Sequence, residues 1–105
     1  MRKVYISGKI TGDDGWQEKF RAAQRVLEAD GWTVLSPLLL RDVVLDYQDY
    51  LAIDYAMIGV CDAVAFLPDW EQSPGARAEF AVAHAGRKQV ICLAPDAAKG
   101  ARDGD

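Results

Sequence analysis

Short apolar segments alternate along this chain with longer segments whose apolar residues recur at helical spacing. The apolar segments are residues 3–7, 32–35, 63–67 and 89–93, and the helical ones are residues 14–29, 47–60 and 73–86. Strands that alternate with helices form a parallel sheet, because each helix carries the chain back in a right-handed crossover. The strands also lack polar alternation, so both faces of the sheet should be covered. The sequence therefore predicts a three-layer α/β fold with a four- to five-stranded parallel sheet.

The length and charge of the chain restrict its class. Its 105 residues suffice for one domain with one core, which we place at residues 1–94, followed by a flexible tail at 95–105. The net charge of −4 argues against a nucleic-acid partner, which would need a basic face. No apolar run approaches the roughly 20 residues of a membrane span, and the first residues lack a signal peptide's apolar segment. We therefore expect a cytoplasmic protein with no membrane or nucleic-acid partner.

The two cysteines do not suggest a redox or metal site. Cys61 and Cys92 are too few for a disulfide framework and too far apart for a zinc or redox pair. Both lie in apolar surroundings in the sequence. We expect them to be buried free thiols.

The segment from Ser73 to Glu79 places a carboxylate near the start of the third helix. Ser73 suits the N-cap and Pro74 suits the first helical position. Glu79 then lies one turn above Gly75 on the same face, where the glycine leaves room for a ligand to approach the carboxylate. The alternative is an ordinary solvated glutamate that the helix dipole favours.

Ligands of parallel sheets bind beyond the carboxyl ends of the strands, at the point where strand order reverses. The segments that follow the first and third strands are residues 7–12 and 68–73. If these strands are neighbours, both loops converge on one cleft, with Glu79 just behind the second. The first loop, Ser7-Gly8-Lys9-Ile10-Thr11-Gly12, resembles a phosphate-cradling turn but matches neither the Walker motif nor the dinucleotide fingerprint. A simple glycine turn is the alternative.

Asp54 and Trp70 are further candidates for a binding site. Asp54 stands in mid-helix among apolar residues, where a carboxylate is costly unless it is paired or used. Its alternative is a solvent-facing or capping role. Trp70 lies in a polar loop and could stack on a base or sugar, whereas Trp16 and Trp32 fit core positions.

Three blocks together resemble the nucleoside 2-deoxyribosyltransferase family, which includes deoxynucleoside monophosphate N-glycosidases. They are the loop from Tyr5 to Gly12, Asp54 eight residues before Asp62, and Ser73-x-Gly75-x-x-x-Glu79. The resemblance covers residues 1–93 and is strongest to a short branch of phage and bacterial genomes whose function is largely unassigned. It implies a flavodoxin-like, Rossmann-like arrangement of the predicted sheet.

The resemblance also implies roles for individual residues. Glu79 matches the nucleophile that attacks the anomeric carbon, Asp54 matches an aspartate that positions the substrate and the departing base, and Tyr5 matches a tyrosine that contacts the nucleophile. Two further sets match substrate-binding positions: Ser7, Gly8, Lys9, Ile10 and Gly12 at the base and sugar, and Ser73 and Gly75 at the 5′ end.

These roles predict cleavage or exchange of the N-glycosidic bond of a (deoxy)nucleoside or its 5′-monophosphate through a glycosyl-enzyme at Glu79. The reaction needs no cofactor or metal. The apolar second helix and the habit of the family both suggest a homo-oligomer. The alternatives are a non-catalytic nucleotide-binding module and a small structural α/β protein.

Overall fold

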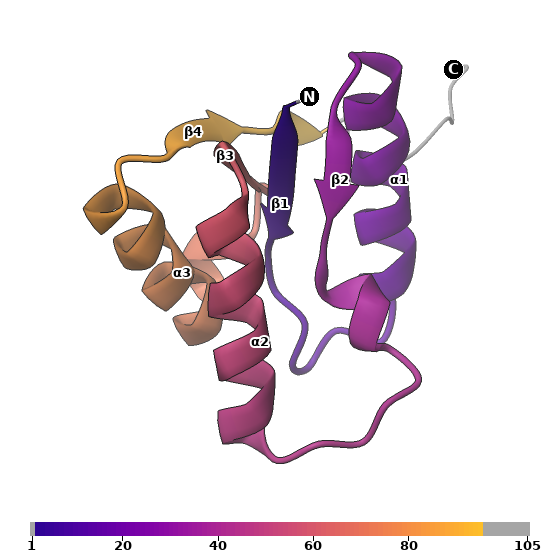
Figure 1. Cartoon of the computed structure of the whole chain (residues 1–105). Helices are drawn as coiled ribbons and strands as arrows, with labels where there is room; N and C mark the ends of the chain where they lie inside the picture. Colours follow the sequence, from indigo (N-terminus) through magenta and orange to yellow (C-terminus); the bar gives the residue numbers. More distant parts are fainter. Residues whose placement is uncertain (1, 96–105) are drawn as a thin grey trace.

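A parallel sheet lies between two layers of helices in the computed structural model, which describes residues 2–95 (Figure 1). The strands are β1 (Lys3–Ser7), β2 (Thr33–Leu35), β3 (Ala63–Phe66) and β4 (Gln89–Cys92). The helices are α1 (Trp16–Ala29), α2 (Tyr47–Val60) and α3 (Pro74–Ala85), with short 3-10 turns η1 (Pro37–Leu40) and η2 (Trp70–Gln72). No helix within residues 2–95 is long and apolar enough to span a membrane. The predicted α/β fold is confirmed with four strands.

The start of α3 follows its predicted capping signal, whereas the start of α1 differs from the prediction. The Ser73 side chain accepts a hydrogen bond from the Ala76 backbone N–H at 3.1 Å, as its predicted N-cap role requires. The first helix begins at Trp16 rather than at residue 14, and Gly15 is its N-cap. Asp13 instead accepts from the Gly15 N–H at 2.9 Å and closes a local turn before the helix. Of the predicted tail at residues 95–105, all but the first residue lies outside the described residues.

The strand order is β2-β1-β3-β4, and every neighbouring pair is parallel. The chain moves outward from β1 to β2 and then crosses back over β1 to β3, so the strand order reverses between β1 and β3. Their register pairs Ser7 with Phe66 at the carboxyl ends of the two strands. The first and third strands are therefore neighbours, which was the condition for their loops to converge, and the two loops open at one edge of the sheet.

Each face of the sheet has its own core. Val4 and Ile6 pack with Phe20 and Leu27 on the face that α1 covers. Tyr5 packs with residues of the α2 and α3 side, because successive strand residues point to opposite faces. Figure 1 shows α2 and α3 together on one side of the sheet. This alternation directs Tyr5 and Ser7 of β1 toward α3.

The cysteines differ from expectation in one respect. Cys61 is buried, but Cys92 is exposed, and both are free. Cys92 lies on the edge strand β4, whose residues are largely exposed within the described part of the chain. The expectation that both thiols are buried is wrong for Cys92.

Replacement of Gly8 by alanine should destabilise the fold. An added Cβ would lie 2.5 Å from Cδ1 and 2.9 Å from Cβ of Leu67, so β1 and the end of β3 would have to separate. We expect a loss of about 1–3 kcal/mol in the free energy of unfolding. Urea denaturation measures it, with Gly59→Ala as the control, because a Cβ there meets no atom within 4 Å. Equal stability of the two variants would contradict the close approach.

Candidate active site

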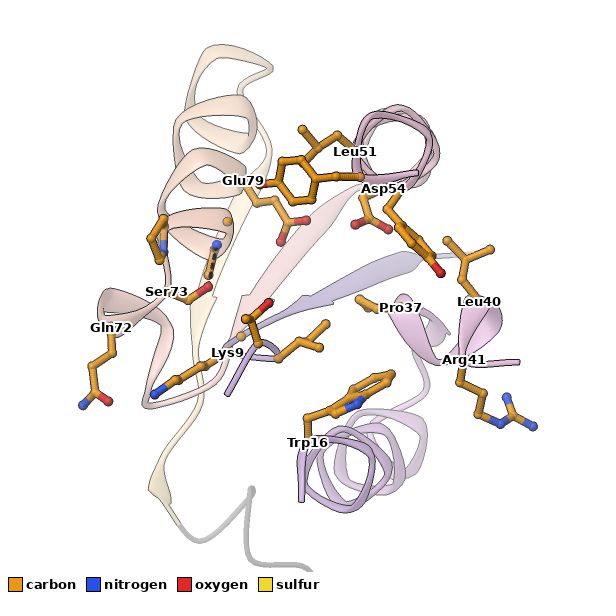
Figure 2. A pocket seen from close by; sticks show the side chains of 18 of the residues that line it. Lys9, Trp16, Pro37, Leu40, Arg41, Leu51, Asp54, Gln72, Ser73 and Glu79 are labelled. Carbon is orange, nitrogen blue, oxygen red and sulfur yellow. Dashed lines mark hydrogen bonds between the residues drawn. The ribbon is translucent and has the colours of Figure 1, made fainter. Parts of the chain in front are cut away.

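A cavity of about 700 Å³ opens at the carboxyl ends of β1 and β3. Its walls are the loop after β1, the segment around η1, the first half of α2 and the start of α3 (Figure 2). Parallel sheets bind ligands at this place, beyond the strands between which the order reverses. The cavity is within the size range of small-molecule sites, which is roughly 300–1,000 Å³.

Glu79 of α3 is held in the cavity wall by two hydroxyl groups from β1. Ser7 Oγ donates to Glu79 Oε1 at 2.6 Å, and Tyr5 OH donates to Glu79 Oε2 at 3.0 Å. The glutamate is only 7% exposed, which excludes the ordinary solvated glutamate considered from the sequence. Each carboxylate oxygen accepts one hydrogen bond, so the side chain is fixed in orientation.

Burial and hydrogen bonding act in opposite directions on Glu79. Burial raises the pKa of Glu79 to about 7, while the hydrogen bond from Ser7 opposes that rise. The charge of Asp54 raises it further, and the Tyr5 hydroxyl lowers it. Burial also raises the pKa of Tyr5 well above its ordinary value, so the phenol remains a proton donor. Glu79 therefore changes its protonation state near neutral pH.

Asp54 of α2 projects toward the same part of the cavity as Glu79 (Figure 2). Its Oδ1 atom is buried and has no hydrogen-bond partner within residues 2–95. Burial raises the pKa of Asp54 to about 6, and the nearby Tyr5 hydroxyl offsets part of this rise. Buried polar atoms in native proteins are almost always paired. The unpaired oxygen therefore marks a position where a ligand can supply the missing donor.

Only part of the loop after β1 lines the cavity. Gly8, Lys9 and Ile10 line the cavity, whereas Gly12 does not and serves a turn, with φ of 81°. The close approach of Leu67 requires a glycine at residue 8, independently of any ligand. Ser7 acts through its hydrogen bond to Glu79.

The start of α3 supplies the opposite end of the wall. Ser73 and Gly75 line the cavity, as predicted from the sequence. A Cβ added at Gly75 would meet nothing nearer than Ser73 Oγ at 3.8 Å. The space beside the glycine is therefore open, and it leads to Glu79 one turn further along the helix.

Trp70 lies elsewhere than expected, while Trp16 and Trp32 pack against the core as expected and Trp16 also borders the cavity. Trp70 does not line the cavity: its ring stacks on Phe80, with centroids 4.8 Å apart and planes 11° apart, and it contacts Phe66. The turn η2 directs this ring into the core on the α3 side, so its placement gives no support to stacking on a base. Trp16, expected in the core, lines the cavity while its edge packs on Phe20.

The sequence reasoning missed the wall that follows β2. This wall combines apolar and aromatic side chains with one arginine, from η1, the following loop and α2: Pro37, Leu40, Arg41, Leu45, Tyr47, Tyr50 and Leu51. The segment carries no glycine or polar motif that suggests a ligand. The available signal was topological, because β2 lies beside β1 and its carboxyl end opens at the same edge of the sheet.

A cluster of ion pairs connects the loop after β1 with the loop after β3. Lys19 Nζ bridges Asp13, at 2.5 Å, and Asp69. Asp69 Oδ1 also accepts the backbone N–H of Lys9 at 3.0 Å. The lysine side chain is 13% exposed, so this pair is shielded from solvent more than ordinary surface ion pairs. The cluster fixes the loop after β1 against the loop after β3.

The raised pKa of Glu79 should make the stability of the protein depend on pH. The folded protein binds this proton more tightly than the unfolded chain, whose glutamate titrates at its ordinary value of 4.5. The contribution of Glu79 to stability therefore falls as pH rises from about 4.5 to about 7 and is constant above. Over that interval, wild type should lose about 3 kcal/mol relative to Glu79→Gln.

Urea denaturation across this pH range measures the difference between the two proteins. Asp54 is present in both, so most of its own titration cancels. Glu71→Gln, which removes an exposed carboxylate in η2, should follow the wild-type curve. Parallel curves for wild type and Glu79→Gln would contradict the raised pKa.

Comparison with solved structures identifies a similar fold. The 2-desoxiribosyltransferase from Leishmania mexicana superposes with a TM-score of 0.71 at 17% sequence identity, over 89% of this chain and 64% of that chain. At this identity the likeness establishes the α/β fold alone. This chain spans less than two thirds of that protein. No curated protein sequence matches the chain.

Residues 2–92 match a family model described as "Domain of unknown function (DUF4406)". The match includes all four strands and all three helices of the structure, together with Tyr5, Asp54 and Glu79. The chain therefore belongs to the DUF4406 family.

Proposed function

We propose that this protein cleaves the N-glycosidic bond of a (deoxy)nucleoside or nucleoside 5′-monophosphate and transfers the sugar to a second base or to water. The observation that carries the proposal is the buried Glu79 carboxylate, which Tyr5 and Ser7 hold at a cavity that Asp54 also lines. The fold shared with a deoxyribosyltransferase supports the same chemistry. Carboxylates are the usual nucleophiles at anomeric carbons.

In the first step, Glu79 attacks the anomeric carbon and forms an ester bond to the sugar. The bond between that carbon and the base nitrogen breaks, and its electron pair leaves with the base. A proton from the carboxylic acid of Asp54 neutralises the departing base. The sugar remains on Glu79, and Asp54 is left as a carboxylate.

The two carboxyl groups are suited to hold one proton between them near neutral pH, because burial raises their pKa values to about 7 and about 6. The higher pKa of Glu79 favours the proton on Glu79 in the resting protein, and the reactive form is the one in which the proton has moved to Asp54. Donors from Ser7 and Tyr5 stabilise the charge on Glu79, whereas Asp54 Oδ1 has no donor. Paired carboxyl groups with different environments commonly divide acid and nucleophile roles in this way.

In the second step, an acceptor attacks the same carbon and the ester bond to Glu79 breaks. Asp54 takes the proton that the acceptor loses, which restores both carboxyl groups. Two displacements at one carbon retain its configuration. Transfer and hydrolysis differ only in the acceptor, which is a base nitrogen in one case and water in the other.

The cavity suggests how the substrate is oriented. We place the 5′ end of the sugar toward Ser73 and Gly75, where the N-terminus of α3 and Lys9 favour a negative group. The base then lies against the apolar wall that includes Trp16, Leu40 and Leu45.

Incubation with deoxynucleosides and their monophosphates, with and without free bases, tests the activity. Chromatography should detect base release or exchange in wild type, and Glu79→Gln should lower the rate by at least about a thousandfold. Mass spectrometry of the wild type should show a sugar adduct on the peptide that contains Glu79. Glu71→Gln is the matched control and should retain full activity.

Other outcomes of this assay identify the alternative functions. Binding of nucleotides without turnover in wild type would contradict the enzyme and support a nucleotide-binding module. A thermal-shift screen in which no nucleoside or nucleotide stabilises the wild type would support a structural role instead.

We also propose that the protein forms a homo-oligomer through the outer face of α2. Two apolar side chains, seven residues apart on this face of the helix, remain exposed: Ile53 at 37% and Val60 at 59%. A second copy that covers them would remove apolar area from water.

Sedimentation equilibrium should give a multiple of the 11.5 kDa chain mass for wild type. The double variant Ile53→Asp, Val60→Asp should shift the protein toward monomer, because charges on this face oppose burial. Val26→Asp, on the outside of α1, is the control and should leave the mass unchanged. A monomeric wild type at every concentration would contradict the proposal.

A further inference from the structure

A second hollow, of about 320 Å³, lies between α1 and the segment that follows β2. Arg21 and Arg25 of α1 line one side, and Ser36, Leu38 and Arg41 line the other. We call this hollow the arginine groove. Apart from Arg41, none of the residues that line it borders the candidate active site.

Positive charge gathers in the arginine groove, although the whole chain carries a net charge of −4. Three arginines line the groove against a single carboxylate, Glu28, which itself accepts a hydrogen bond from Gln24 at 3.0 Å. Arg21 and Arg25 are four residues apart on α1, so their like charges repel in the empty groove. A bound anion would relieve that repulsion.

Arg21 and Arg25 are only weakly neutralised by the protein, whereas Arg41 donates to the Leu38 backbone oxygen at 2.7 Å and lies 3.8 Å from Asp42. Arg21 pairs with Glu18 at 3.4 Å, but that glutamate side chain is 79% exposed, and such surface pairs contribute little. Arg25 makes no ion pair in the part of the chain from residue 2 to residue 95. Both guanidinium groups are therefore able to bind an added anion.

A buried hydroxyl group also lines the arginine groove. Ser36 is 2% exposed, and its oxygen accepts the Leu38 backbone N–H at 3.1 Å. This bond uses the hydroxyl oxygen as an acceptor, so its proton can be donated to an anion in the groove.

We propose that the arginine groove binds an oxyanion of the phosphate type. Guanidinium groups match the geometry of phosphate oxygens and form pairs of charge-assisted hydrogen bonds with them. Val34, Leu38 and Leu39 add an apolar border beside the charged part, which suits the carbon skeleton of a small phosphomonoester. The groove is separate from the proposed glycosidic reaction and does not depend on it.

An NMR titration of the ¹⁵N-labelled protein with inorganic phosphate tests the proposal, with chloride used to hold ionic strength constant. Saturable shifts are expected at the amides of Ser36, Leu38 and Leu39, with half-saturation at about 1 mM. Parallel titrations with sulfate and with ribose 5-phosphate test the class of anion. If ribose 5-phosphate binds in the groove more tightly than inorganic phosphate, the ligand is a phosphomonoester. If the two bind equally well, the phosphate group alone accounts for binding.

Arg25→Gln should raise the dissociation constant at least about fivefold, since one charge-assisted pair is lost. Arg87→Gln removes the same charge from an exposed site outside the groove and should leave binding unchanged. Glu79→Gln should also bind phosphate normally, so a failed glycosidase assay does not affect the result. The proposal is overturned by unsaturable shifts, by shifts confined to Gly75 and Ala76, or by equal effects of the two arginine substitutions.

Discussion

The parallel pairing of β1 with β3 is the constraint on which the candidate site depends. The register that sets Ser7 beside Phe66 brings the carboxyl ends of both strands to one edge of the sheet. Alternation along β1 then turns Tyr5 and Ser7 toward α3, where they meet the two oxygens of Glu79. A slip of one residue would turn both hydroxyl groups to the α1 face and leave the glutamate buried without donors. The register that builds the sheet therefore also orients the carboxylate.

The site has features that the fold alone does not require. Burial raises the pKa of Glu79 and of Asp54, and one oxygen of Asp54 has no partner within residues 2–95. Two apolar residues of similar size would cover this edge of the sheet at less cost, because buried carboxyl groups lose their hydration. Perturbed carboxyl groups beside a cavity are typical of functional sites. This cost is the physical reason to prefer a chemical role for the pair over a structural one.

Much of the fold could be predicted because local signals and tertiary structure agree. Strand and helix alternate as the periodicity indicates, the bounds of β1 and α2 are those expected, and Ser73 caps α3. The convergence of the two loops followed from topology. The failures concern the direction in which side chains point: Trp70 turns into an aromatic cluster, and Cys92 is exposed. Polarity of the neighbouring sequence does not determine direction in loops and edge strands, because packing against distant elements decides it.

In the proposed chemistry, the identity of the acceptor in the second step distinguishes a transferase from a hydrolase. Fold likeness does not decide this, since one fold supports several reactions. Water is far more concentrated than any free base, so transfer requires that an acceptor base bind where the departing base has been. The wall formed by Trp16, Leu40 and Leu45 is apolar and therefore suited to hold a second base while it excludes water. In the proposed reaction, the segment after β2, which carries most of that wall, would select between the two outcomes, and the carboxyl pair would not.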